Sequence, residues 1–153
     1  MANATAGGYY PPAGFHFSVE FVGLGNNNDT RFQSVSGLSV EYDVESYKEG
    51  GENRFEHQLP LRTKYPDLSL KRGLLTDSQV IQWFLDAFEN RQFSTAQVNV
   101  SLLNEQHQPL VSWNVFGAWP KKWSVSDFNA QENAIVVESM DLCYTYFSVQ
   151  YNN

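Results

Sequence analysis

The sequence predicts a mainly β protein, an antiparallel β-sandwich or barrel with one packed α-helix. Three observations lead to this fold class. Apolar and polar residues alternate in several short segments, as in strands that bury one face. A single segment shows the apolar spacing of a helix. Phe, Tyr and Trp supply 15% of the 153 residues, and aromatic side chains favour strands and large packed surfaces.

Strand patterns occur on both sides of the helical segment. In residues 15–21 every second residue is apolar, so one face of a strand is buried. The polar turn between 96–103 and 109–119 predicts a hairpin, and 134–149 is predicted to be one long strand. The remaining strand material begins near Arg31, breaks at Gly37 and resumes at Leu38, covers 68–71, and flanks a polar segment at 40–44 and 55–59.

One helix is predicted to begin at about Thr76 and to end at about Asn90. Thr76 and Gln79 have the spacing of a capping box, in which side chains bond free backbone N–H groups of the first turn. Asp77 places a negative charge at the positive end of the helix dipole. The residues expected to pack the helix against the sheet recur at helical spacing, and they are Val80, Ile81, Phe84, Ala87 and Phe88.

Composition limits the class of protein. Ten Lys and Arg oppose seventeen Asp and Glu, so the net charge is −7, which argues against binding nucleic acid through its phosphates. The basic pairs Lys71–Arg72 and Lys121–Lys122 are predicted to be solvated strand ends. No apolar run approaches the roughly 18 residues of a membrane span. The first residues lack a basic and an apolar region, so we expect synthesis in the cytoplasm without a signal peptide.

No residue pattern predicts catalysis, a cofactor or a metal. His16, His57 and His107 lie in three segments without the paired spacing of metal ligands. Asp127 and Glu138 have the spacing of the first and twelfth positions of a calcium loop, but the sixth position is not glycine. The sequence thus gives no positive evidence for catalysis, and we expect no cofactor. A pair of carboxylates for glycoside hydrolysis stays open among the seventeen acidic residues, because their spacing is spatial.

A charged segment with two glycines is predicted to be an extended hairpin arm at about 45–58. It is too polar to form a core of its own, and its glycines can adopt positive φ. One interpretation is a mobile hairpin tip, and the other is an arm that contacts a partner. The candidate contact residues are Glu45, Tyr47, Lys48, Glu49, Gly50, Gly51, Glu52, Asn53 and Arg54. Residues 1–14, rich in Gly and Pro, are predicted to be a flexible arm before a single domain at 15–153.

Three blocks occurring in order carry a resemblance to a known family. They are RFQSVSGL, GGENRFEHQLPLRTKYPDLSLKRGL and PLVSWNVFGAWPKKWSVSDFNAQENAIVVESMDLCYTYF. From about Tyr10 to Phe147 the chain resembles the tail tube proteins of contractile phage tails, in the branch of extracellular contractile injection systems.

The resemblance implies a structural subunit and not an enzyme. Hexameric rings would stack into an inner tube through which cargo passes, with the 45–54 residues contacting the adjoining ring. Sheath, baseplate and cap proteins would be the other partners. The subunit would be made in the bacterial cytoplasm and would act in an extracellular phage tail-like particle released by lysis, or in a virion tail.

The aromatic content also supports a second hypothesis. A monomeric β-domain could bind a glycan or another ligand by stacking it on Trp113, Trp119 and Trp123. Aromatic residues on strands are more often part of the core. A monomer in solution would favour the ligand-binding domain, and rings or tubes would favour the tube subunit.

Overall fold

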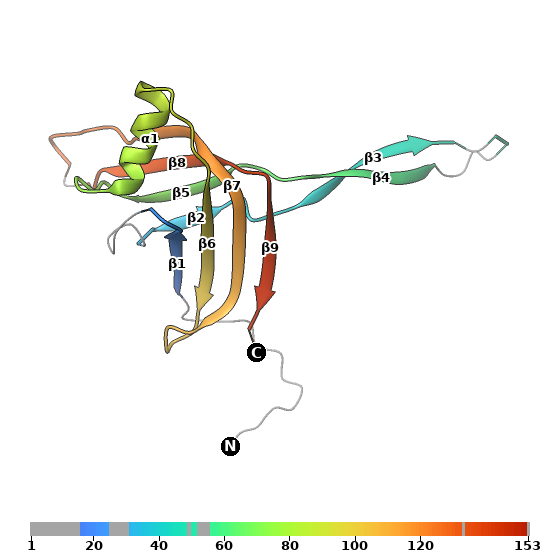
Figure 1. Cartoon of the computed structure of the whole chain (residues 1–153), viewed down its shortest axis with the longest axis horizontal. Helices are drawn as coiled ribbons and strands as arrows, with labels where there is room; N and C mark the ends of the chain where they lie inside the picture. Colours follow the sequence, from blue (N-terminus) through green and yellow to red (C-terminus); the bar gives the residue numbers. More distant parts are fainter. Residues whose placement is uncertain (1–15, 25–30, 49, 52–55, 133, 153) are drawn as a thin grey trace, which may run out of the picture.

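The computed structural model describes residues 16–24, 31–48, 50–51, 56–132 and 134–152, and within them the chain is mainly antiparallel β with one helix (Figure 1). The predicted arm at 1–14 lies outside these residues. The strands are β1 (His16–Phe21), β2 (Ser34–Ser36), β3 (Glu41–Tyr47), β4 (His57–Lys64), β5 (Leu68–Gly73), β6 (Ala96–Leu103), β7 (Pro109–Val125), β8 (Val137–Cys143) and β9 (Tyr146–Tyr151), and α1 (Gln79–Glu89) lies between β5 and β6.

Strand β7 belongs to both layers of the body. Its first part pairs with β6 and β9, and its last part pairs with β8. The strands β1, β6, β7 and β9 therefore form one layer, while the end of β7 with β8, β5 and β2 forms a second layer that crosses it (Figure 1). A strand that bends from one sheet into another is the usual corner of such a packing.

The bend in β7 is set at Gly117. Ala96 pairs with Ala118 but Val98 pairs with Val115, so β7 carries a bulge between these pairs. Gly117 has φ 71°, a left-handed conformation that glycine adopts without steric cost. Leu142 pairs with Pro120 in the second layer, so the chain that follows β8 must turn where β7 turns.

The prediction of one long strand at 134–149 is therefore wrong. The segment is divided into β8 and β9, and the corner lies at Tyr144 and Thr145. The Thr145 N–H donates to the Phe116 carbonyl at 2.9 Å, and the Thr145 Oγ1 lies 2.6 Å from the position of a Cβ built on Gly117. β8 and β9 separate because each follows a different part of β7.

The helix begins two residues later than predicted. Ser78 is the N-cap, and its hydroxyl accepts a hydrogen bond from the Ile81 N–H at 3.2 Å. The proposed Thr76–Gln79 capping box is thus wrong. Val80, Phe84 and Ala87 are buried and Ile81 packs against the core, but Phe88 is 45% exposed. Trp83, which was not predicted, is 95% buried and completes the i, i+3, i+4, i+7 pattern from Val80.

The core lies between the helix and the two layers. It contains Val19, Leu70, Phe84, Val98 and Met140, each fully or almost fully buried. The predicted 96–103 and 109–119 hairpin is confirmed, although β7 continues through Pro120 to Val125.

A buried ion pair joins the second layer to the helix. Arg72 Nε donates to Glu138 Oε2 at 2.7 Å, and the two side chains are 2% and 0% exposed. Arg72 Nη2 also donates to the hydroxyl of Ser78 at 2.8 Å, and the guanidinium lies 5.0 Å from the centre of the Phe32 ring. The prediction that Lys71–Arg72 is a solvated strand end is wrong for Arg72, whose opposite residue on β8 is Glu138. Lys121 and Lys122 are exposed as expected, but they lie within β7 and not at its end.

Candidate assembly surfaces

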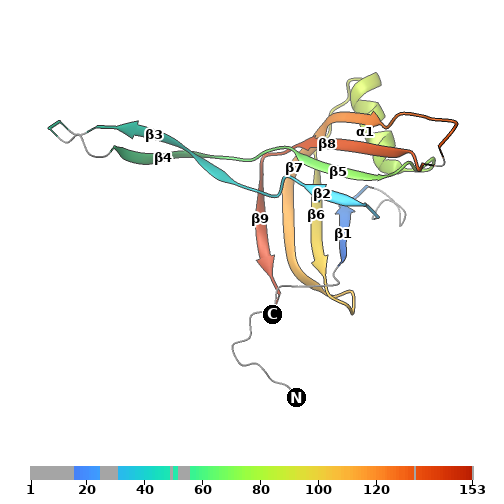
Figure 2. The ribbon, with the colours of Figure 1, turned by 180° about the vertical axis from the view of Figure 1, so that it is seen from behind.

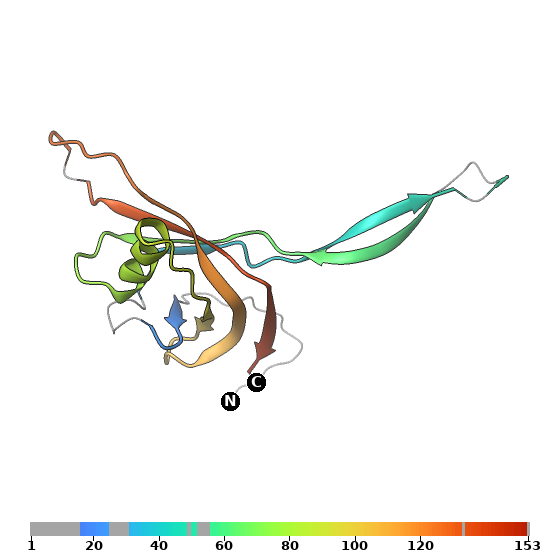
Figure 3. The same cartoon turned by 45° about the horizontal axis from the view of Figure 1, so that its top comes forward.

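The hairpin arm, defined as residues 41–64, projects away from the body (Figures 1 and 2). Strands β3 and β4 form a two-stranded sheet of their own and pair with no other described strand. Figure 3 shows the arm and the loop between β7 and β8 extending from opposite sides of the body. The predicted 45–58 arm is thus the outer part of a longer hairpin.

The hairpin arm exposes apolar side chains. Tyr42, Val44 and Leu61 are each more than half exposed, and Tyr47 and Leu59 are nearly so. An isolated two-stranded hairpin is only marginally stable in water. The strands of the body bury one face in the hydrophobic core, whereas the described strands of the hairpin arm do not pack on that core.

Charged side chains flank the end of the hairpin arm. Lys48 Nζ lies 3.7 Å from Glu56 Oε1, with both side chains about half exposed or more. Gly51 has φ 84° and nothing lies within 4 Å of a Cβ built on it, so the turn requires its backbone freedom and not a close contact. The candidate contact residues Glu49, Glu52, Asn53 and Arg54 lie outside the described residues, whereas Glu45, Tyr47, Lys48, Gly50 and Gly51 are exposed.

A second cluster of charges lies at the base of the hairpin arm. Lys64 Nζ is 3.2 Å from Asp43 Oδ1 and 3.6 Å from Glu41 Oε1. The hydrogen bond to Asp43, together with the charges of Asp43 and Glu41, raises the pKa of Lys64 above its usual value. Since all three groups are at the surface, the cluster contributes little to the stability of the fold.

Two strands of the first layer have an open edge. In the order β1, β6, β7, β9, the strands β1 and β9 each have one described strand neighbour. Their outward N–H and C=O groups are available to pair with another chain. Figure 1 shows β1 and β9 at the two edges of this layer, with β6 and β7 between them.

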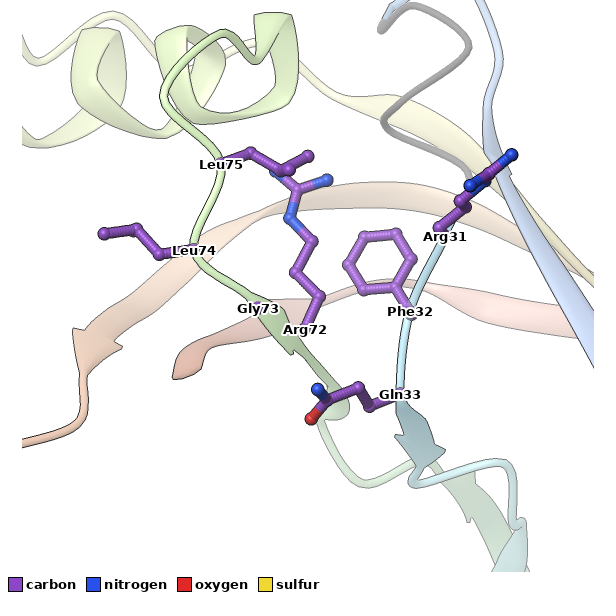
Figure 4. A pocket seen from close by; sticks show the side chains of 7 residues that line it. All are labelled: Arg31, Phe32, Gln33, Arg72, Gly73, Leu74 and Leu75. Atoms are coloured by element: carbon purple, nitrogen blue, oxygen red, sulfur yellow. The ribbon is translucent and has the colours of Figure 1, made fainter. Parts of the chain in front are cut away.

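A cleft lies near the start of the helix. It has a volume of about 380 Å³ and is lined by Arg31, Phe32, Gln33, Arg72, Gly73, Leu74 and Leu75. Figure 4 shows the Phe32 ring beside the Arg72 side chain, with Arg31 pointing away. The Arg72 guanidinium already donates to Glu138 and Ser78, so its charge is balanced within the fold.

The three tryptophans of the ligand-binding hypothesis do not form one stacking platform. Trp113 and Trp123 pack against the core, and the Trp123 Nε1–H donates to Glu138 at 3.4 Å. Trp119 instead meets the edge of Phe93, with ring centres 6.0 Å apart. All three side chains are half-buried, as expected of aromatic residues that serve the fold.

The titratable residues do not gather into a metal site in the part of the chain that the structure describes. No group of three or more His, Cys, Asp or Glu side chains there could hold a metal ion. His16 Nε2 lies 2.7 Å from His107 Nδ1 although the sequence placed them in separate segments. Within the same described residues, no helix is long and apolar enough to cross a membrane.

A family model decides the class of the protein. The model of the T4-like virus tail tube protein gp19 matches residues 13–148. The chain belongs to this family. It is a structural tube subunit of the tail tube type, and the comparisons do not support a ligand-binding β-domain. The resemblance found in the sequence is confirmed.

Solved structures extend the tail tube assignment to contractile injection systems. A chain of the anti-feeding prophage cap has a TM-score of 0.81 and 26% identity, with 97% of each chain covered. A chain of the anti-feeding prophage baseplate has a TM-score of 0.77 and 26% identity, covering 99% of this chain and 98% of that one. A chain of the PVC sheath-tube complex in the extended state has a TM-score of 0.77 and 25% identity, covering 94% and 93%. No curated protein sequence matches the chain.

Proposed function

We propose that six copies of this subunit form a ring and that the rings stack into the inner tube of a contractile injection particle or phage tail. One observation carries this proposal. A subunit of the tail tube family has a complete core in its body but a hairpin arm whose apolar side chains its own chain leaves exposed. Association with further copies would cover that surface.

Ring closure is proposed to use the open edges of the first layer. The β1 edge of one copy would pair with the β9 edge of the next, a heterologous contact that closes when the rotation between copies is one sixth of a turn. Pairing would satisfy the backbone groups that both edges expose. Apolar burial around α1, where Phe88 and Phe93 are exposed, would add to the contact between copies.

Stacking of rings is proposed to use the outer part of the hairpin arm. The residues that would contact the adjoining ring are Glu45, Tyr47, Lys48, Glu49, Gly50, Gly51, Glu52, Asn53 and Arg54. Each exposed ion pair is worth only about 0.2 to 1 kcal/mol. The contact therefore depends on its repetition around the ring.

The tube would act with other proteins of the particle. The similar chains come from cap, baseplate and sheath-tube structures, and we propose corresponding cap, baseplate and sheath contacts for this subunit. It would be made in the bacterial cytoplasm and released within the particle. Six copies at −7 each give a ring charge of −42, so we propose a neutral or acidic lumen that lets cargo pass without adsorbing acidic molecules.

Electron microscopy of the purified protein tests the proposal. Negative staining should show rings or tubes, and sedimentation at micromolar concentration should show an assembly larger than one subunit of 17.5 kDa. A folded protein that stays monomeric across this concentration range would contradict it. Salt-sensitive binding of DNA to preformed tubes would contradict the proposed lumen charge.

A further inference from the structure

The strands of the hairpin arm have two chemically different faces. Opposite residues of an antiparallel pair share a face. Tyr42 lies opposite Thr63 and Val44 lies opposite Pro60. Because alternate residues of β3 also share a face, these four side chains lie together. None of them is charged, and all four are exposed, with Tyr42 at 61% and Val44 at 54%.

The opposite face at the base of the hairpin arm is charged. Glu41 lies opposite Lys64, and Asp43 falls on the same side, since its carboxylate reaches the Lys64 amine at 3.2 Å. Arg62, two residues before Lys64 on β4, is exposed and falls on this face as well. The face therefore carries two carboxylates and two cations. The register shift between Tyr42 and Val44 keeps the two faces separate because β4 has an additional residue there.

We infer that the uncharged face, Tyr42, Val44, Pro60 and Thr63, is the surface of the hairpin arm that packs on a second copy of this chain. The inference rests on the proposed function, because it names the contact surface of an arm whose role there is assembly. The body does not cover this face, and β3 and β4 pair with no other described strand. Burial of these apolar side chains against a neighbouring subunit would stabilise the contact between the two copies.

Charge selects this face over the opposite one. The opposite face carries two carboxylates and two cations, and taking charged groups out of water is costly even when they are paired. The uncharged face does not have this disadvantage. A second copy can therefore approach it closely and exclude water.

Four consecutive residues provide matched variants for the test. Glu41, Tyr42, Asp43 and Val44 alternate between the two faces of one strand, and each is changed singly to Thr, which keeps the tendency to form a strand. Y42T and V44T should raise the protein concentration needed for half-maximal tube formation at least tenfold. E41T and D43T should change it less than threefold. Circular dichroism checks that each variant is folded.

The outcomes separate this inference from the proposed function. If the unmodified protein forms no ring or tube, the proposed function fails and the inference fails with it. If it assembles and all four variants assemble equally well, the inference alone is overturned. Larger losses for E41T and D43T than for Y42T and V44T would also overturn it, because the charged face would then be the contact.

Footprinting of the unmodified protein provides a second test that needs no variant. Hydroxyl radicals should oxidise Tyr42 rapidly in dissociated subunits, where it is exposed, and at least fivefold more slowly in assembled tubes. Mass spectrometry gives both rates from the same sample before and after assembly. A Tyr42 that reacts equally fast in tubes and in subunits would overturn the inference.

Discussion

The ion pairs of the body and of the hairpin arm differ in their surroundings. Arg72 and Glu138 are 2% and 0% exposed and 2.7 Å apart, with Ser78 as a further partner of the guanidinium. Lys64 and its partner Glu41 are 58% and 70% exposed and 3.6 Å apart. The first pair is part of the folded core, whereas the second is at the surface, where water and salt screen the attraction.

The two regions differ in the interactions that stabilise them. The body contains its own core, cap and buried charge pair, so its structure is determined within one chain. The described part of the hairpin arm has a ladder of backbone hydrogen bonds and surface ion pairs, and most of its side chains are exposed. Changes in the body should therefore alter the stability of the subunit, and changes in the hairpin arm should alter assembly.

The largest effect is expected when the buried pair is broken. Glu138→Leu leaves the Arg72 guanidinium buried without its carboxylate and should lower the free energy of unfolding by about 3 to 5 kcal/mol. Urea unfolding followed by tryptophan fluorescence measures this change. The control is Arg72→Met combined with Glu138→Leu, which removes both charges and should recover most of the loss. A double variant as unstable as the single one would show that packing, and not charge, determines the cost.

The corner in β7 gives the next largest effect. Gly117→Ala forces a Cβ into a left-handed backbone position and places it 2.6 Å from Thr145 Oγ1. The matched control is Gly23→Ala, because Gly23 has φ 79° but open space around the built Cβ. We expect Gly23→Ala to lower the free energy of unfolding by about 1 kcal/mol through backbone strain alone. Gly117→Ala should lower it by about 2 kcal/mol or more, because the contact with Thr145 adds to that strain. Equal losses in thermal unfolding would mean that the Thr145 contact is unimportant.

Variants at the end of the hairpin arm should barely change the stability of the body. Replacing Lys48 and Arg54 by Glu is expected to alter the free energy of unfolding by no more than about 0.5 kcal/mol. Replacing Gly50 and Gly51 by Val strains the turn, because Gly51 has φ 84°, but this strain is confined to the end of the hairpin arm and leaves the body folded. Rings should still form, but long tubes should not. Part of the tube length should return for the charge variant at high salt, since salt screens the new repulsion.

Sedimentation and microscopy decide between the outcomes for these variants. Tubes of unchanged length would show that 45–58 is an ordinary mobile tip. Loss of rings together with tubes would place this segment in the ring interface.

A further effect is expected in alkaline solution. Burial raises the pKa of Tyr144 from about 10 to about 12, and its hydroxyl donates to the Gly37 carbonyl at 3.3 Å. The folded protein therefore favours the protonated phenol. The stability that the protonated phenol contributes to the folded state is complete below pH 10 and is lost as the pH rises toward 12. Tyr144→Phe should lose stability less steeply between pH 10 and 12 than the unmodified protein, and equal slopes would contradict this assignment.

Local patterns predicted much of the fold. The limits of β6 and the turn to β7 follow from alternation and from a polar loop, and four of the five predicted packing residues of the helix contact the core. Phe88 was wrongly included in the packed face of the helix. It comes one residue after the buried Ala87 and lies outside the apolar stripe. Trp83 lay on the same stripe as Val80 and Ala87, so strict helical spacing would have found it.

The parts that could not be predicted depend on distant partners. Nothing within 134–149 marks the corner at Thr145, because the bend is set by Gly117 in another strand. Arg72 and Glu138 look like solvated charges until the register of β5 and β8 brings them together. In the candidate site, the sequence showed a charged double-glycine segment but not the length of the hairpin or the separation of its faces. Those follow from the pairing register of β3 and β4.

The pairing of β1 with β6 has a consequence for the order of folding. His16 pairs with Leu103, and β5 pairs with β8, so both pairings join segments that are far apart in the sequence. In the hairpin arm, β3 pairs instead with the next strand of the chain, β4. Distant pairings slow folding because a long loop must close before they form. We expect the body to appear only after nearly the whole chain has left the ribosome, so that a truncated chain offers no complete β9 edge. Incomplete subunits would then be kept out of a growing ring by the timing of their own folding.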